Sequence, residues 1–144
     1  MLSGFMIIVI ISLYGFKSGL VFDSICTYII TMPILTIKTN VKASEVPEGF
    51  HEETTTLLAQ VLKKPVENIF VILETDVNMT FGGKRTLCAV LTLGSVGMFS
   101  PSHTPAEEIT KGLGPHIRSK LGIEKDRYFI LYDDRKIESI GMNV

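Results

Sequence analysis

The 144-residue sequence has no tryptophan, only two cysteines, and no surplus of charge of either sign. Cys26 and Cys88 cannot form a disulfide framework, and their spacing is not that of metal ligands. With 14 Lys and Arg against 15 Asp and Glu, the chain lacks the basic excess that binding a nucleic-acid backbone requires. The length corresponds to one domain with a substantial core. We therefore expect a single domain without a nucleic-acid partner.

Long apolar runs are also scarce, and the one present lies at the N-terminus. Residues 1–31 hold just two charged side chains, Lys17 and Asp23. Both follow the apolar run FMIIVIISLYGF at residues 5–16. This run has the length of a signal-peptide core, whereas a membrane-spanning helix needs about 20 apolar residues. No basic residue precedes it, and no A-x-A-like cleavage site follows. Three interpretations remain open: a poor signal peptide, a membrane anchor, or upstream sequence absent from the working protein.

The composition changes at an internal methionine, Met32, and this change favours the third interpretation. We therefore divide the chain into an N-terminal extension, residues 1–32, and a folded domain, residues 33–144. If residues 1–31 are retained, membrane association remains an alternative.

The domain begins with a strand, a helix and a second strand. Residues 33–40, PILTIKTN, alternate in the manner of a strand. Apolar residues at helical spacing follow Pro47, and Pro65 ends the helix because proline disfavours the helical conformation at the preceding residue. Residues 69–74, IFVILE, are typical of a buried strand. The glycines and asparagine of residues 76–85 indicate a loop, with room for a short strand inside it.

The second half of the domain repeats this pattern. Residues 88–95 predict a strand, and Thr104 opens a helix, with proline at the first helical position and Glu107 three residues after the cap. Gly122 is a good helix terminator, and residues 128–132 form the closing strand.

The two halves match at a constant offset of 59 residues, which places Leu62 on Leu121. A β-α-β unit occurring twice implies an α+β fold in which two helices cover one face of a four-stranded mixed sheet. Nothing in this short chain remains to cover the other face. Apolar strand residues would lie exposed there: Phe70, Ile72, Val90 and Tyr128. We infer that copies of the same chain cover this face, so that the protein is an oligomer.

Several short motifs, none of them specific alone, occur in a fixed order from residue 32 onward. They are Met32-Pro33, Thr39-Asn40, Val46-Pro47-Glu48-Gly49-Phe50, Lys64-Pro65, Phe81-Gly82-Gly83, Ser95-Val96-Gly97 and Asp126-Arg127. As an ordered set they resemble the family of macrophage migration inhibitory factor and D-dopachrome tautomerase. The resemblance implies the tautomerase fold and a homotrimer that closes the open sheet faces around a central barrel. It further implies cofactor-free keto–enol isomerisation of phenylpyruvate- and dopachrome-type compounds.

The same resemblance assigns roles to individual residues. Pro33 matches the family's N-terminal proline, whose secondary amine is the catalytic base, and Lys64 matches the pocket lysine. Val96 matches a position whose backbone N–H contacts the substrate. Phe129 stands where the cytokine branch has a tyrosine donated by a neighbouring subunit, and Leu131 replaces a pocket asparagine. The pocket thus loses a hydroxyl and an amide relative to that branch, and the sequence leaves open whether this chain belongs to the cytokine or the D-dopachrome branch.

A proline base must be largely unprotonated near neutral pH, and both an apolar pocket and a nearby cation such as Lys64 disfavour the charged amine. If any residue remains attached to Pro33, its nitrogen is an amide with no basic lone pair. We therefore expect the active protein to begin at Pro33, after removal of the methionine before it.

Simpler interpretations stand beside these roles. Pro33 alone would be a strand-edge proline, and Lys64 with Lys63 would be a helix C-terminal pair that complements the helix dipole. Phe81-Gly82-Gly83 alone indicates only a turn. The histidines lack ligand spacing and are expected at the surface: His51, His103 and His116.

Two function classes therefore remain. The first is a tautomerase with Pro33 as its base. The second is a secreted or membrane-held cytokine-like protein that binds a cell-surface receptor and retains the extension. The resemblance implies a protein that is both cytoplasmic and secreted without a cleaved signal peptide.

Overall fold

The computed structural model describes residues 32–96 and 106–136. The extension, residues 1–31, lies outside them, as does the predicted helix start at Thr104. Strand β1 (Ile34–Thr39) is followed by the short 3-10 helix η1 (Ala43–Glu45) and by helix α3 (Phe50–Leu62). A second 3-10 helix, η2 (Val66–Asn68), leads into β2 (Phe70–Glu74). The remaining elements are β3 (Ala89–Val96), α4 (Ala106–Leu121) and β4 (Tyr128–Arg135).

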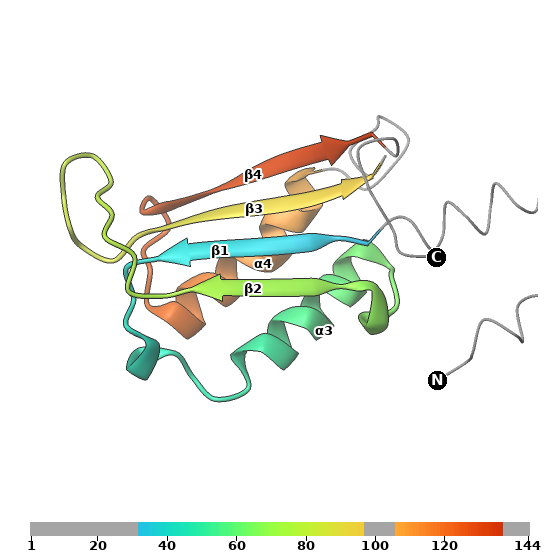
Figure 1. Cartoon of the computed structure of the whole chain (residues 1–144), viewed down its shortest axis with the longest axis horizontal. Coiled ribbons are helices and arrows are strands. Elements are labelled where there is room, and N and C mark those ends of the chain that lie inside the picture. The colour runs from blue at the N-terminus through green and yellow to red at the C-terminus, as the bar shows by residue number, and fades with distance from the viewer. Residues whose placement is uncertain (1–31, 97–105, 137–144) are drawn as a thin grey trace, which may run out of the picture. The chain divides into compact units, whose positions relative to one another are not determined.

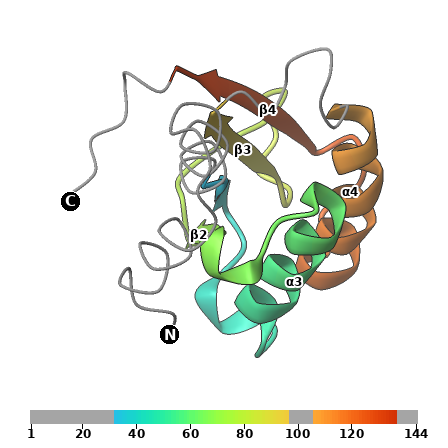
Figure 2. The ribbon, with the colours of Figure 1, turned by 90° about the vertical axis from the view of Figure 1, so that its right-hand side faces the viewer.

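The four strands form one mixed sheet in the order β2-β1-β3-β4. β1 is parallel to β2, β3 is parallel to β4, and the two pairs join through the antiparallel contact of β1 with β3. Helices α3 and α4 lie side by side on one face of this sheet (Figures 1 and 2). The predicted α+β architecture, with two β-α-β units and two helices on one face, is confirmed.

The core lies between the sheet and the two helices. Alternate residues of the central strands point into it, as the period of two in the sequence requires, with Leu35, Ile37, Leu91 and Leu93 fully buried. The helices supply one stripe each, which consists of Phe50, Thr54, Leu58 and Leu62 from α3 and Ile109, Leu113, Ile117 and Leu121 from α4. Gly122, at φ 66°, ends α4 as predicted, because its N–H donates to the carbonyl of Arg118 in a left-handed turn.

The opposite side of the sheet, which we call the outer face, exposes five large apolar side chains: Ile34, Phe70, Ile72, Phe129 and Leu131. The prediction that Phe70 and Ile72 are exposed is confirmed, Val90 on the same face is half-buried, and the prediction for Tyr128 is wrong. Tyr128 pairs with Ala89 and points toward the helices. Its hydroxyl lies where a Cβ on Gly114 would come within 2.8 Å, so the glycine of α4 makes room for the ring.

The predicted loop after β2 contains one tight hairpin turn. Phe81 and Lys84 exchange backbone hydrogen bonds of 3.0 and 3.1 Å, and Gly82 and Gly83 between them both have positive φ. Two consecutive residues in that region form the type of two-residue turn that glycine favours. The prediction of a turn is confirmed, and the short strand considered inside the loop is a single bridge.

Candidate functional site

Pro33 lies directly before β1 and is buried. Its carbonyl oxygen accepts a hydrogen bond of 2.9 Å from the N–H of Phe70, which ties it to the first residue of β2. Because β3 runs antiparallel to β1, the last residues of β3 pass beside the first residues of β1. Pro33 therefore stands where the start of one strand and the end of its neighbour meet.

Lys64 reaches the same end of the sheet through the way α3 ends. The C-cap residue Lys63 takes the left-handed conformation, with φ 52° and ψ 45°, and reverses the chain. The N–H of Lys64 then donates to the carbonyl of Ala59 at 3.0 Å, which holds Lys64 against the last turn of the helix. Lys63 is exposed, whereas Lys64 is half-buried. The end of α3 and the start of β1 lie at one end of the domain (Figure 1).

Val96 is the last residue of β3 and pairs with Arg135 of β4. Since Ile34 pairs with Gly94, the register places Val96 opposite Met32, one residue beyond Pro33. The structure accordingly brings Pro33, Lys64 and Val96 to one end of the sheet. Gly97, which completes the Ser-Val-Gly motif, lies outside the described residues.

Phe129 and Leu131 are not brought to this end within one chain. Phe129 pairs with Val90, which pairs in turn with Lys38, five residues along β1 from Pro33. At about 3.3 Å per residue, this separation is about 16 Å. Both side chains lie on the outer face and are 46% and 48% exposed, respectively. Leu131 pairs with Thr92, which pairs with Thr36, three residues or about 10 Å along β1 from Pro33. Neither side chain therefore lies beside the Pro33 of its own chain.

Arg127 is linked to Phe129 through the ring of Phe81, and no pattern in the sequence predicts this contact. Its guanidinium lies 5.1 Å from the centre of the Phe81 ring, and that ring lies 6.0 Å from the ring of Phe129. The guanidinium also donates to the carbonyl oxygens of the hairpin loop at 2.8 to 3.3 Å, namely those of Phe81, Lys84 and Thr86. Asp126-Arg127 was part of the resemblance, but only contacts across 40 residues reveal what Arg127 holds.

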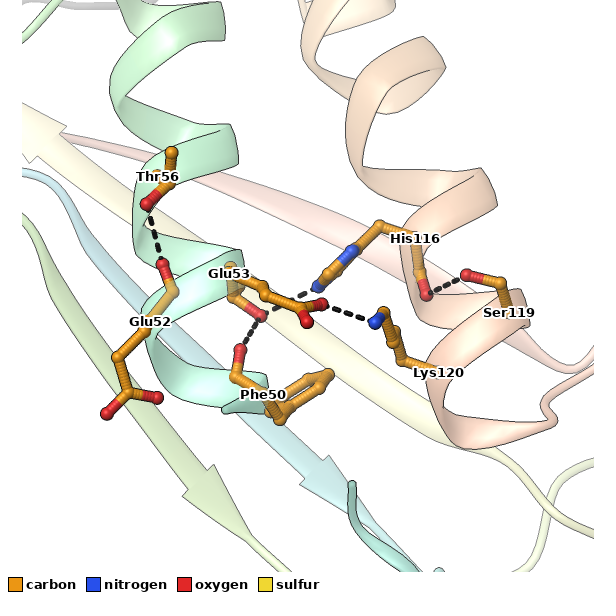
Figure 3. Close-up of polar contacts among 8 residues, drawn as sticks. Phe50, Glu52, Glu53, Thr56, His116, Ser119 and Lys120 are labelled. Carbon is orange, nitrogen blue, oxygen red and sulfur yellow. Dashed lines mark hydrogen bonds and ion pairs between the residues drawn. The ribbon is translucent and has the colours of Figure 1, made fainter. Parts of the chain in front are cut away.

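A polar cluster joins the two helices away from the Pro33 end (Figure 3). The hydroxyl of Thr54 donates to the Phe50 carbonyl at 2.6 Å and lies 2.9 Å from Nε2 of His116, whose ring stacks on Phe50. Glu53 pairs with Lys120 at 2.5 Å. The expectation that all histidines lie at the surface is wrong for His116, which is half-buried because it lies one turn after Leu113 and next to Ile117, at the edge of the buried stripe of α4. His51 is exposed, and His103 lies outside the described residues.

Burial is the main cause that lowers the pKa of His116, with Lys120 acting in the same direction and Glu53 opposing. Contact with Lys120 lowers the pKa of Glu53. These groups connect α3 with α4, and their geometry is that of a structural contact. Within residues 32–96 and 106–136, no group of His, Cys, Asp and Glu side chains is arranged to hold a metal ion. None of the helices in those ranges is long and apolar enough to cross a membrane.

Comparison with known proteins gives one consistent result. The family model described as macrophage migration inhibitory factor matches residues 32–144. The macrophage migration inhibitory factor of Mus musculus is 36% identical over 112 residues, which cover 78% of this chain and 96% of that protein. D-dopachrome decarboxylase-B of Xenopus laevis is 29% identical over 112 residues, with 78% and 94% covered. The solved structure of the factor from Trichinella spiralis aligns with a TM-score of 0.69 and 35% identity, over 76% of this chain and 96% of that one.

Proposed function

Because the chain belongs to the macrophage migration inhibitory factor family, we propose that it is a keto–enol tautomerase whose general base is the free amine of Pro33. The observation that carries this proposal is the position of Pro33. It is buried at the end of the sheet to which the turn after α3 also brings Lys64. A buried secondary amine beside a cation is disfavoured in its charged form and is therefore available as a base.

The reaction needs one proton to move between carbon and oxygen. The neutral amine takes a proton from the carbon next to the substrate carbonyl, and the electrons of the broken C–H bond pass to the carbonyl oxygen. Lys64 stabilises the negative charge that develops on this oxygen or holds the substrate carboxylate. The protonated amine then returns its proton to the enolate oxygen, or, in the reverse direction, to the carbon. Compounds of the phenylpyruvate and dopachrome type carry the carbonyl and the acidic carbon that this sequence of steps requires.

The pocket is completed by the neighbouring subunit in a homotrimer. Phe129 lies about 16 Å and Leu131 about 10 Å along the sheet from Pro33, and both side chains are on the exposed face, so they serve another copy's Pro33. Phe129 supplies an aromatic wall without the hydroxyl of a tyrosine, and Leu131 supplies an apolar contact. Such a pocket favours aromatic substrates and recognises few of their polar groups.

The proposal is tested with the chain that begins at Pro33 and with its Pro33→Gly variant. Ketonisation of enol-phenylpyruvate, followed by absorbance, should be fast for the first and at least 100-fold slower for the second, since glycine supplies a primary amine of different geometry. Pro65→Ala, which changes a proline at the same end of the sheet, is the matched control and should retain most of the activity. Equal rates for the Pro33→Gly variant and the parent chain would remove Pro33 as the base.

A second function is favoured by the residues in front of Pro33. While they remain attached, the Pro33 nitrogen is an amide, and a protein in that form is proposed to act as a cytokine-like ligand of a cell-surface receptor, either secreted or held at a membrane. Receptor binding would then be unaffected by Pro33→Gly. A cell-binding assay in which the variant competes with the parent protein at the same concentration separates the two functions.

A further inference from the structure

Ser95, in β3, carries a buried hydroxyl that nothing in the described structure satisfies. The residue is 3% exposed, and its Oγ has no hydrogen-bond partner among the residues described. Buried hydroxyl groups are nearly always hydrogen-bonded, because an unpaired one has lost its water without gaining a partner. The unpaired hydroxyl of Ser95 therefore indicates a hydrogen-bond partner that is absent from this form of the chain.

The sheet register places Pro33 opposite Ser95. Ile34 pairs with Gly94, so the next pair outward is Pro33 with Ser95. At the far end of the same two strands, the N–H of Asn40 donates to the carbonyl of Cys88, which marks a hydrogen-bonded pair. Hydrogen-bonded and non-hydrogen-bonded pairs alternate along antiparallel strands, so Pro33 and Ser95 form a non-hydrogen-bonded pair. In such pairs the two residues lie closest.

The side chains of Pro33 and Ser95 also share one face of the sheet. Leu35 and Leu93, two residues further in along each strand, are fully buried against the helices. Side chains two residues apart point the same way, so Pro33 and Ser95 face the helices too, and both are buried. The start of β1 and the end of β3 lie together in Figure 1.

The chemical state of the Pro33 nitrogen explains why the hydroxyl is unpaired. With Met32 attached, this nitrogen is a tertiary amide, which has no hydrogen to donate and no basic lone pair to accept with. A free secondary amine has both. The residue with the unpaired hydroxyl thus lies opposite the residue whose nitrogen changes from inert to strongly hydrogen-bonding when the chain begins at Pro33.

We propose that Ser95 Oγ hydrogen-bonds the free amine of Pro33 and positions it for proton transfer, an inference that rests on the proposed function. When the neutral amine takes a proton from the substrate carbon, the nitrogen carries two N–H bonds. One of these protons returns to the substrate, and the other is donated to Ser95 Oγ. The serine gives and takes no proton overall, and it keeps the exchangeable N–H directed at the substrate.

Other charged groups at this end of the sheet are common to all the variants and do not alter the comparison. They are Lys64 after α3, Glu107 and Glu108 at the start of α4, and Asp133, Asp134, Arg135 and Lys136 at the end of β4.

The kinetic test uses the chain that begins at Pro33. Ser95→Ala should lower kcat about tenfold, the loss expected from one hydrogen bond to a charged group, with little change in KM. The acidic limb of the kcat/KM profile should move to lower pH, since the protonated amine loses an acceptor. Ser95→Thr keeps the hydroxyl and should keep the wild-type profile, as should the exposed control Ser119→Ala. An unshifted acidic limb in Ser95→Ala would overturn the proposal.

A stability test decides the proposal even if no turnover is found, so that its failure and that of the proposed function are distinguishable. In the chain from Met1, Ser95→Ala removes an unpaired hydroxyl and should leave the urea midpoint unchanged or raise it. In the chain from Pro33 the same substitution removes a hydrogen bond and should lower the midpoint. A shift of the same sign and size in both chains would contradict the proposed contact.

Discussion

At the scale of single residues, Lys63 and Lys64 show how one backbone conformation separates two adjacent lysines. Lys63, at φ 52°, ends α3 and remains exposed, whereas Lys64 is half-buried at the end of the sheet that holds Pro33. The sequence predicted a dipole-complementing pair as the simple alternative, and only Lys63 has the exposure typical of that role. The difference in exposure between the two lysines arises from the left-handed conformation of Lys63. A non-glycine residue adopts this conformation rarely, so the sequence does not predict it.

The proposed electrostatic role of Lys64 predicts a large kinetic effect. Lys64→Ala should lower kcat/KM for enol-phenylpyruvate about 100-fold, as removal of one preorganised partner of a developing oxyanion does. Lys63→Gly, which suits the left-handed conformation, is the control and should change the rate less than twofold. Similar losses in both variants would indicate that helix termination, and not the Lys64 charge, determines the activity.

His116 makes stability depend on pH. Because burial lowers its pKa below the ordinary 6.5, the unfolded chain binds more protons than the folded one between the two values. The stabilisation is complete above 6.5 and is lost as pH falls from there to the folded-state value. The urea midpoint should therefore drop between pH 8 and pH 5.5, and less so in His116→Gln. The exposed His51→Gln should retain the full drop, and an equal drop in His116→Gln would remove His116 as the cause.

Glu53 acts in a separate, more acidic range. Its pKa is lowered from 4.5 by Lys120, so its stabilising effect is present above 4.5 and is lost as pH falls through the lower folded-state value. Measurements above pH 5 thus separate the effect of His116 from that of Glu53.

At the scale of elements, α3 and α4 pack closely because α4 carries glycine where the helices meet. A Cβ on Gly112 would lie 2.8 Å from Cγ2 of Val61, a branched side chain with little freedom to turn away. In an isolated helix, glycine to alanine stabilises by about 1 kcal/mol. The contact predicts the opposite sign here, since overpacking costs about 1–3 kcal/mol.

Gly112→Ala should accordingly lower the unfolding free energy measured in urea. The double variant Gly112→Ala with Val61→Ala reopens the space, and its loss should be smaller than the sum of the two single losses. Ser119→Ala on the exposed side of the same helix should be neutral within 0.5 kcal/mol. A higher unfolding free energy in the single variant Gly112→Ala would contradict this expectation and would show that the two helices move apart at little cost.

The elements themselves were largely predictable, and the reasons are local. Alternating residues predicted β1, and the offset of 59 residues predicted that the second half repeats the first. The face on which a residue lies was harder to predict in β4, because an almost continuous apolar run has no alternation. Tyr128 was therefore assigned to the wrong side. The side of each β4 residue is fixed by its register with β3 and by the space that Gly114 leaves, and both are long-range properties.

At the scale of the whole molecule, the outer face is the surface that bears on oligomerisation. Five large apolar side chains are exposed on one side of a four-stranded sheet: Ile34, Phe70, Ile72, Phe129 and Leu131. An apolar face of this kind is typical of an interface. The assignment of Phe129 and Leu131 to a shared pocket came from the resemblance, and no spacing in the sequence could have supplied it. The structure adds their separation from the Pro33 of the same chain, about 16 Å along the sheet for Phe129 and about 10 Å for Leu131.

The trimer proposal predicts that charge on the outer face separates the subunits. Phe129→Asp should reduce the mass in light scattering from that of three chains to that of one, because a carboxylate would be buried without a partner. Val66→Asp, at an equally exposed apolar position on η2 away from the outer face, is the matched control and should leave the mass unchanged. A Phe129→Asp protein with the parent's mass would mean that Phe129 faces solvent.

The central claim is that a free amine on Pro33 makes this domain an enzyme. Its most direct test is the rate of enol-phenylpyruvate ketonisation by two pure proteins, one beginning at Met1 and one at Pro33, each with its N-terminus verified by mass spectrometry. We expect turnover in the second protein and a rate at the uncatalysed level in the first, since an amide nitrogen is not a base. Equal turnover in both proteins would contradict the central claim and would place the base elsewhere.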